Sequence, residues 1–281
     1  MKKMQRTINC NGKLLSLEKP LIMGILNVTP DSFYDGGKYT QPEQIYQRVK
    51  KLIDEGADII DVGAASSRPG ADEVPQNTEI KRLTMALEII RNNYPDICIS
   101  IDTYRSEVAR FAVENFKANI INDIMGGSAD ENMFKTIADL QVPYILMHIK
   151  GTPKTMQNNP HYENIIQEII YYFSERIKKL RLLGVNDIII DPGFGFGKTL
   201  EHNYIILKNL EHFRIFELPV LVGISRKSMI YKYLNITPQE ALPGTIALNM
   251  IALLNGANIL RVHDVAEAKQ IVELFEMYKK V

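Results

Sequence analysis

The chain has 281 residues, of which 46% are hydrophobic and 23% charged, and this length and composition fit one α/β domain with a large core. The 33 basic and 33 acidic side chains cancel, so no global field draws the protein to nucleic acid or to an anionic membrane, and an anion must be held by a local site. No apolar run of signal-peptide length follows the basic start, and no later segment approaches the roughly 20 apolar residues of a membrane span. We therefore expect a cytoplasmic protein.

The first predicted element is a β-hairpin at about residues 5–18. Its two strands, Arg6–Cys10 and Lys13–Leu17, flank Asn11-Gly12, a dipeptide typical of two-residue hairpin turns. We expect the hairpin to cap the bottom of the domain that follows it. Cys10 and Cys98 lack the spacing of a metal site, so both are expected to be reduced and structural.

After the hairpin, short apolar runs alternate with longer segments of helical period. This order is typical of parallel strands joined by crossover helices. We count eight runs and predict a (β/α)8 TIM barrel over about residues 21–281, with no linker or charge block that would divide residues 1–281 into two domains. The predicted strands are Leu21–Asn27, Asp58–Gly63, Cys98–Asp102, Asn119–Ile124, Pro143–His148, Asp187–Gly193, Pro219–Ser225 and Ile259–Asp264.

The segments between the strands carry apolar residues at helical spacing. Gly56, Gly184 and Gly256 each precede a strand, where a helix can end in a left-handed cap. The last predicted helices, Glu240–Asn255 and Ala266–Tyr278, are apolar enough to contribute to an interface between subunits. One predicted helical face carries Ile80, Leu83, Leu87 and Ile90, and another carries Ile166, Ile169, Ile170, Phe173, Ile177 and Leu180.

Nearly every predicted strand ends in a polar or titratable residue. A single Asp or Asn after a strand is commonly a helix N-cap or a turn former, but that interpretation does not explain so many together. Because a barrel brings the carboxyl ends of its strands to one rim, where catalytic groups of this architecture lie, we predict an enzyme with one shared polar site there. The residues are Asn27, Asp61, Asp102, Asn122, Asp123, His148, Asp191, Ser225, Arg226, Lys227, Arg261 and His263.

Three loops at this rim are rich in glycine, polar groups or cations. The first, Asn27–Gly37, has polar groups that could close over a ligand, and the second is Ser66–Gly70. In the third, Asp191–Lys198, alternating glycines let the backbone approach a flat ligand, to which Phe194 or Phe196 offers an apolar face. This third loop is similar to a Walker phosphate loop but lacks its residue spacing.

The strand ends and the loops that follow them carry ordered motifs. They are Asn27-Val28-Thr29-Pro30-Asp31-Ser32-Phe33, Ser66-Ser67-Arg68-Pro69-Gly70, Ile101-Asp102-Thr103, Ile121-Asn122-Asp123, Met147-His148 with Gly151-Thr152-Pro153, Asp191-Pro192-Gly193-Phe194-Gly195-Phe196-Gly197-Lys198, Ser225-Arg226-Lys227-Ser228 and Arg261-Val262-His263-Asp264. These motifs resemble those of the dihydropteroate synthase family, over the chain from Leu21 to Asp264. This family joins 6-hydroxymethyl-7,8-dihydropterin diphosphate to 4-aminobenzoate and releases diphosphate. The resemblance therefore implies a transferase of an alkyl group other than methyl, in folate biosynthesis.

The resemblance implies where the pterin binds. A pterin presents an amide-like edge from which one buried carboxylate can accept two hydrogen bonds, and Asp191 matches the family's residue for this contact. By the same resemblance Lys227 donates to the ring and Arg261 stacks on it, whereas Met147 can equally be ordinary core. The implied pterin contacts are Asp102, Asn122, Met147, Asp191, Lys227 and Arg261, and the implied catalytic residues are Lys227, Arg261, Asp102 and, for orienting loops or removing a proton, Asp61.

The leaving diphosphate needs positive charge and a metal, because its departing oxygens gain negative charge in the transition state. The resemblance makes Asn27 the protein ligand of Mg²⁺ and assigns the diphosphate to Asn27, Ser67, Arg261 and His263. Without the motif, His263 could also be a histidine hydrogen-bonded into the barrel wall. We expect a dissociative substitution, in which diphosphate leaves first, the dihydropterin stabilises the cation on its exocyclic methylene, and the amine then attacks.

The resemblance places 4-aminobenzoate between the second and third loops. Where the family usually reads glycine-glycine-glutamate-serine-threonine-arginine, this chain reads Gly63-Ala64-Ala65-Ser66-Ser67-Arg68, which removes a possible loop anchor and a methyl contact. These substitutions lie where 4-aminobenzoate, and the sulfonamides that mimic it, would bind. We therefore expect a sulfonamide target, but the sequence leaves the affinity for aminobenzoate and the sensitivity to sulfonamides open. The implied contacts are Ser66, Ser67, Arg68, Pro69, Phe196, Lys227 and Ser228, with Phe33 and Asp35 closing over them.

Two other functions stay open at this point. A pterin-dependent methyltransferase of related barrel type shares the pterin contacts but has no need of a diphosphate clamp. A barrel that binds pterin without catalysis would follow if the altered second loop no longer held aminobenzoate, although Arg68 and Lys227 remain. The family also implies a homodimer, and we expect no fused pyrophosphokinase or aldolase domain because the length leaves no residues for one.

Overall fold

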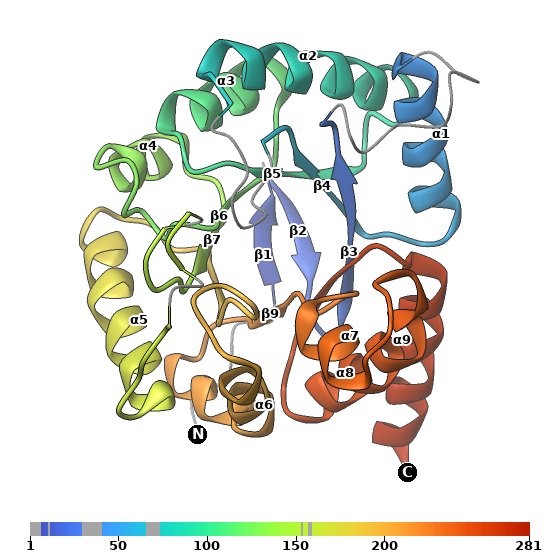
Figure 1. Ribbon diagram of the computed structural model, residues 1–281. Coiled ribbons are helices and arrows are strands. Elements are labelled where there is room, and N and C mark those ends of the chain that lie inside the picture. Colours follow the sequence, from blue (N-terminus) through green and yellow to red (C-terminus); the bar gives the residue numbers. More distant parts are fainter. Residues whose placement is uncertain (1–6, 11, 30–40, 66–73, 153, 157–158) are drawn as a thin grey trace.

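Parallel strands form the centre of the structure, a computed structural model that describes residues 7–10, 12–29, 41–65, 74–152, 154–156 and 159–281 (Figure 1). Among these residues the sheet has eight strands in the order β8-β7-β6-β5-β4-β3-β10-β9. A parallel bridge between Ile190 and Val220 joins the two ends of this order, so the sheet is a nearly closed barrel, as predicted. The strands are β3 (Leu21–Asn27), β4 (Ile59–Gly63), β5 (Cys98–Asp102), β6 (Ile120–Asp123), β7 (Tyr144–Met147), β8 (Ile188–Asp191), β9 (Leu221–Val222) and β10 (Ile259–Val262).

Helices surround the barrel and bury their apolar faces against it (Figure 1). In α5, Ile169, Phe173 and Ile177 are buried, and the side chain of Asn164 caps the first turn by accepting a hydrogen bond from the Gln167 backbone. The predicted glycine caps at residues 56, 184 and 256 are confirmed, with φ angles of 95°, 84° and 105°. The helices are α1 (Gln41–Asp54), α2 (Gln76–Asn93), α3 (Ser106–Phe116), α4 (Met133–Leu140), α5 (Ile165–Leu182), α6 (Leu200–Lys208), α7 (Ser228–Leu234), α8 (Leu242–Leu254) and α9 (Val265–Lys280), with 3-10 helices η2 (Leu210–Phe216) and η3 (Gln239–Ala241).

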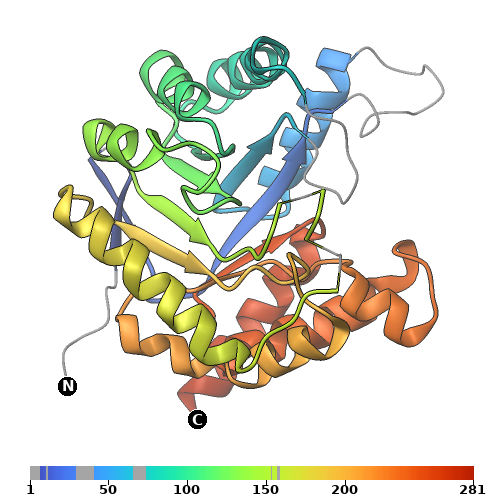
Figure 2. The ribbon, with the colours of Figure 1, turned by 60° about the vertical axis from the view of Figure 1, so that its left-hand side comes forward.

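The hairpin closes the end of the barrel at which the strands begin (Figure 2). Its strands β1 (Thr7–Cys10) and β2 (Lys13–Ser16) pair antiparallel, as predicted. Ile8 and Cys10 are buried against residues from the starts of the barrel strands, so the bottom is sealed by apolar contact. Cys10 and Cys98 are both free thiols, with their sulfur atoms 3.8 Å apart. The rim that carries the polar strand ends therefore lies opposite the hairpin.

The predicted strand Pro219–Ser225 is wrong in length, because β9 covers only Leu221–Val222. After β9 the chain turns, with the Lys227 backbone donating to the Ile224 carbonyl and Arg226 at a φ of 52°. This turn begins at Ile224, so the backbone leaves the parallel ladder before it reaches Ser225, where the predicted strand ended. The other strands lie within or match their predicted bounds. No helix among the described residues is long and apolar enough to cross a membrane.

Replacing Ile8 with alanine should lower the free energy of unfolding by about 2–5 kcal/mol, because the side chain is fully buried in the hairpin's contact with the barrel. Chemical denaturation measures this change. The matched control is Leu14→Ala in the partner strand, whose side chain is 66% exposed, and which should change stability by less than about 0.5 kcal/mol. Equal effects of the two variants would show that the hairpin does not seal the barrel.

Candidate active site

A buried guanidinium joins two carboxylates at the carboxyl ends of the strands. Arg261 of β10 donates from Nε to Oδ2 of Asp61 at 2.6 Å and from Nη2 to Oδ2 of Asp102 at 2.7 Å. The amide of Asn122 donates to the same oxygen of Asp61 at 3.1 Å. Asp61 is completely buried, and its Oδ1 has no hydrogen-bond partner among the described residues. Ends of β4, β5, β6 and β10 thus converge in one polar cluster, as the sequence predicts.

Burial dominates the electrostatics of this cluster. It raises the pKa of Asp102 to about 7, although the Arg261 charge opposes the shift and the Asp61 charge adds to it. Burial also works against the charge of Arg261, but Asp61 and Asp102 together outweigh it and raise the arginine pKa further. The guanidinium therefore stays charged, while Asp102 can hold or release a proton near neutral pH.

Asp191 at the end of β8 and Lys227 in the turn after β9 face the same rim. The Lys227 amine donates to the Phe194 carbonyl at 2.6 Å and lies 4.8 Å from the centre of the Phe196 ring. Burial lowers the pKa of Lys227 to about 8, while the Asp191 charge opposes the shift. Asp191 is buried and accepts from the Gly193 backbone at 2.7 Å. Burial raises its pKa, with Lys227 opposing.

Gly193 makes the turn that brings the third loop to this position. Its φ is 71°, and a Cβ at Gly193 would lie 2.0 Å from the His148 carbonyl oxygen. Only glycine fits such a close approach of two backbones at this φ.

His263 and Asn27 complete the rim. The Nδ1 of His263 lies 3.2 Å from Oγ of Ser225, and the His263 backbone also donates to that hydroxyl. Burial, followed by the Arg261 charge, lowers the pKa of His263 to about 4, so the ring is neutral at pH 7. A Cβ at Gly63 would lie 3.5 Å from Oδ1 of Asn27 and 3.6 Å from Oδ2 of Asp102, so these two oxygens flank the space that the glycine leaves open.

Some of the other predicted site residues lie within the described part of the chain, and the rest lie outside it. Met147 is buried in a cluster with Met125 and Ile149, so its core interpretation holds whether or not it also lies beneath a ring. Of the two phenylalanines, Phe194 is fully buried and only the half-buried Phe196 can offer a face to a ligand. Ser228 is the first residue of α7. Ser66, Ser67, Arg68, Pro69, Phe33 and Asp35 lie outside the described residues.

Two pairings at the rim were not foreseen from the sequence. Arg226 forms a bidentate ion pair with Asp264, at 2.8 and 2.9 Å, and ties the turn after β9 to the end of β10. Lys198 is buried and its amine lies 3.0 Å from Nδ1 of His148. Arg226 lies within the motif Ser225–Ser228 and Lys198 is the last residue of the motif Asp191–Lys198, but nothing in the sequence identifies their partners.

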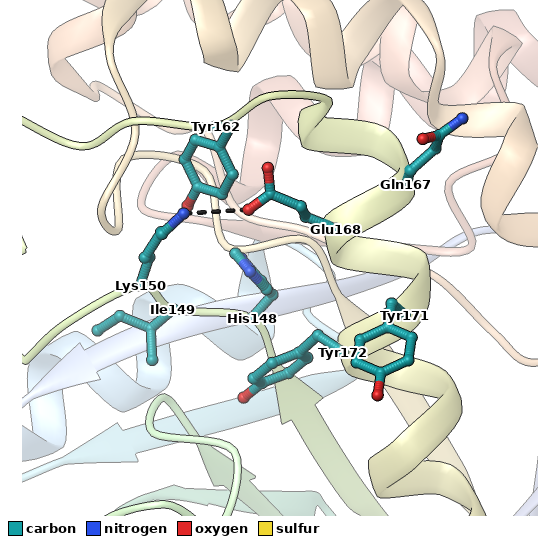
Figure 3. Close-up of a pocket in the computed structure, with 8 residues that line it drawn as sticks. All are labelled: His148, Ile149, Lys150, Tyr162, Gln167, Glu168, Tyr171 and Tyr172. Carbon is teal, nitrogen blue, oxygen red and sulfur yellow. Dashed lines mark hydrogen bonds and ion pairs between the residues drawn. The ribbon is translucent and has the colours of Figure 1, made fainter.

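A pocket of about 470 Å³ lies elsewhere, between the loop after β7 and helix α5 (Figure 3). Side chains alternate along a strand, so His148 faces away from the side on which Met147 contacts the barrel interior. The pocket is therefore on the outer side of β7. The prediction that His148 belongs to the shared polar site is wrong, because this side chain lines the outer pocket instead. Its lining residues are His148, Ile149, Lys150, Tyr162, Gln167, Glu168, Tyr171 and Tyr172.

A barrel whose rim gathers buried carboxylates, an amide, a lysine and an arginine is an enzyme suited to a small heterocycle with several hydrogen-bonding atoms. The family model described as pterin binding enzyme matches residues 23–263, and the chain belongs to this family. The resemblance inferred from the motifs is thereby confirmed.

Individual relatives support the same conclusion. The dihydropteroate synthase of Escherichia coli (strain K12) is 43% identical over 267 residues, with 94% of both chains covered. The crystal structure of Yersinia pestis dihydropteroate synthase with a sulfonamide drug has a TM-score of 0.92 and 38% identity, covering 98% of this chain and 100% of that one. Dihydropteroate synthase of Xanthomonas albilineans with 4-aminobenzoic acid has a TM-score of 0.91 and 36% identity, covering 98% and 99%. The synthase is thus favoured over the methyltransferase.

The low pKa of His263 predicts a pH dependence of stability. Between the ordinary value of 6.5 and about 4, the unfolded chain binds a proton that the folded protein does not, so this residue makes stability fall as pH falls through that window. In His263→Gln, the loss of melting temperature between pH 7 and pH 4.5 should be smaller than in the parent protein by roughly 2–4 °C. The raised pKa of Asp102 makes stability rise as pH falls. This contribution is the same in the parent protein and in the variant, so it does not affect the difference between their melting temperatures. Equal losses in calorimetry would mean that His263 titrates normally.

Proposed function

We propose that this protein condenses 6-hydroxymethyl-7,8-dihydropterin diphosphate with 4-aminobenzoate to give 7,8-dihydropteroate and diphosphate. It would be a transferase of an alkyl group other than methyl. The observation that carries the proposal is the Arg261 guanidinium held between Asp61 and Asp102, with Asn122, Asp191 and Lys227 on the same rim. The family match and the synthase relatives support it.

The rim offers complementary groups to a dihydropterin. Asp191 uses one oxygen for the Gly193 backbone, and a carboxylate has lone pairs left for the amide-like edge of the ring. Asp102 and Asn122 would hold other ring nitrogens. Arg261 is fixed by two carboxylates and keeps 19% of its side chain exposed, which leaves part of its planar surface for stacking. Lys227, charged for the most part below its pKa of about 8, would donate to the ring.

Asp61 would act as a positioning residue in this mechanism. Its carboxylate is fully buried and receives hydrogen bonds from Arg261 and Asn122. Both donors bind Oδ2, and Oδ1 is buried as well, so neither oxygen is exposed to an amine that attacks from the rim. The sequence suggested that Asp61 either orients loops or removes a proton. Its contacts favour a positioning role, in which it orients Arg261, over proton removal.

Magnesium fits the donors that the rim provides. Among the described residues there is no group of three or more His, Cys, Asp or Glu side chains that could hold a metal, whereas Asn27 offers an amide oxygen at the end of β3. Mg²⁺ is often held by few protein oxygens together with substrate phosphates and water. Asn27 would hold an ion that arrives with the diphosphate, and Mg²⁺ would stabilise charge on the leaving oxygens. Ser67, Arg261 and neutral His263 would complete the diphosphate site.

Bond cleavage would precede bond formation. The carbon–oxygen bond to diphosphate breaks first, and the electron-rich dihydropterin stabilises the resulting cation on its exocyclic methylene. The amine of 4-aminobenzoate then forms the carbon–nitrogen bond and loses a proton. Phe196, Lys227 and Ser228 would border the aminobenzoate, with Ser66, Ser67, Arg68 and Pro69 opposite and with Phe33 and Asp35 closing over it.

The protein is also proposed to be a cytoplasmic homodimer and a sulfonamide target. Helices α8 and α9 pack together and leave apolar side chains exposed: Ile251 and Leu254 on the first, and Leu274 and Met277 on the second, are 40%, 46%, 65% and 61% exposed. A patch of this kind suits burial against a second copy of the same surface. The synthase crystallised with a sulfonamide supports the drug assignment.

The reaction is tested by incubating the protein and Mg²⁺ with the dihydropterin diphosphate, with and without 4-aminobenzoate, and measuring dihydropteroate and diphosphate by mass spectrometry. Lys227→Ala and Arg261→Ala should each lower product formation by about 100-fold or more, because each removes a charge from a water-poor site. Chelation of the metal should stop the reaction, and added Mg²⁺ should restore it. Lys150→Ala, which removes an exposed ion pair with Glu168 outside the barrel, is the control and should retain full activity.

Two outcomes would contradict the proposal. Release of diphosphate without dihydropteroate would mean a working pterin site with a failed aminobenzoate loop. No reaction with either substrate combination would favour the methyltransferase or the protein that only binds pterin.

A further inference from the structure

Lys198 is a buried lysine at the active-site rim that the proposed reaction does not use. Only 3% of the residue is exposed. Its amine lies 3.0 Å from Nδ1 of His148 and donates to the carbonyls of His148 at 3.2 Å and of Phe196 at 2.9 Å. An ammonium group has three protons, and here each has one acceptor. The lysine therefore joins the end of β7 to the loop after β8.

His148 gives Lys198 a fixed anchor. Its backbone donates to the Asp191 carbonyl at 2.9 Å, and its ring packs edge-on against Tyr172, with ring centres 4.7 Å apart. The ring lies on the outer side of the barrel, among the residues that line the pocket (Figure 3). Burial, and then the charge of Lys198, lowers the pKa of His148 well below its usual value. A neutral imidazole can accept at Nδ1 from the ammonium.

Lys198 acts on Phe196 through the backbone of the third loop. It binds the Phe196 carbonyl, while the Phe196 backbone donates to the Gly193 carbonyl at 3.1 Å. The Tyr162 hydroxyl adds a second hold by donating to the Gly197 carbonyl at 2.8 Å. With its peptide fixed at both ends, the Phe196 ring stays half-buried beside the Lys227 amine.

Stability alone does not explain a lysine at this position. Burying an ammonium group removes its hydration. Among the described residues no carboxylate forms an ion pair with this one, and its three hydrogen-bond partners are neutral. Methionine has a similar shape and would be buried without that desolvation. The lysine is therefore better explained by what its three hydrogen bonds hold in place.

We propose that Lys198 is a positioning residue that holds the Phe196 ring against Lys227 and so sets the affinity for the aromatic amine substrate. The inference rests on the proposed synthase reaction, in which Phe196 borders that substrate. Lys198 is not expected to touch either substrate.

The test is a steady-state comparison of Lys198→Met, Phe196→Leu and the double variant. Lys198→Met should raise the KM for 4-aminobenzoate by roughly 5- to 20-fold, with kcat and the KM for the dihydropterin diphosphate changed less than about twofold. Phe196→Leu should act in the same direction. Because both changes act through one ring, the double variant should be no worse than Phe196→Leu alone. Lys135→Met, at an exposed position of α4, is the matched control and should behave as the parent protein.

Three results would overturn the inference. The first is a Lys198→Met protein whose KM for aminobenzoate is unchanged. The second is a Lys198→Met protein that is merely unstable, so that its KM values for both substrates, its kcat and its melting temperature all change together. The third is independent, multiplied effects of the two single changes. If Lys198→Met does not fold, Tyr162→Phe takes its place, because it removes the hydrogen bond to the Gly197 carbonyl in the same loop. This variant should also raise the KM for 4-aminobenzoate, and an unchanged KM would refute the inference. A parent protein that makes no dihydropteroate would instead refute the synthase proposal itself.

Discussion

The active-site rim depends on the ion pairs of Arg261 with Asp61 and Asp102. Asp61 in β4 is fully buried, and Asp102 at the end of β5 has a side chain that is only 12% exposed. A carboxylate with so little access to water is strongly destabilising without a partner. One planar guanidinium can bind both, because its N–H groups point in fixed directions. The arginine thereby sets where β4, β5 and β10 present their polar ends, and lysine could not replace it with the same geometry.

The ion pairs of Arg261 leave hydrogen-bonding capacity on the carboxylates unused, and a bound heterocycle could use it. Asp61 keeps one buried oxygen without a partner among the described residues, and Asp102 has a pKa of about 7 because burial opposes its charge. Hydrogen-bond donors on a bound ring would satisfy the Asp102 carboxylate, so binding energy and orientation come from one set of contacts. Around this centre, the Arg226–Asp264 pair and Lys198 fix the loops that carry Lys227 and Phe196.

The barrel and its rim could be predicted from the sequence, whereas the pairings within the rim could not. Runs such as Leu21–Asn27 and Cys98–Asp102 are apolar up to a polar last residue, and this pattern alone indicates a buried parallel strand and its end. Arg261 and Asp61, however, are separated by 200 positions in sequence, and the side chains that meet depend on strand stagger around the barrel. Lys198 is harder still, because a lysine in a glycine-rich loop suggests a surface cation, and its three acceptors come from backbone and histidine atoms that only the fold brings close.

The central role of Arg261 can be measured directly by carbon-13 NMR titration of the aspartate carboxyl groups in the free protein. One carboxyl, assigned by its loss in Asp102→Asn, should titrate with an apparent pKa of about 7. In Arg261→Met the same carboxyl should titrate at higher pH, because the cation that favours its charged form is gone. An Asp102 signal that titrates near its ordinary value of 3.8, or one that does not move when Arg261 is replaced, would contradict the arrangement on which the site is built.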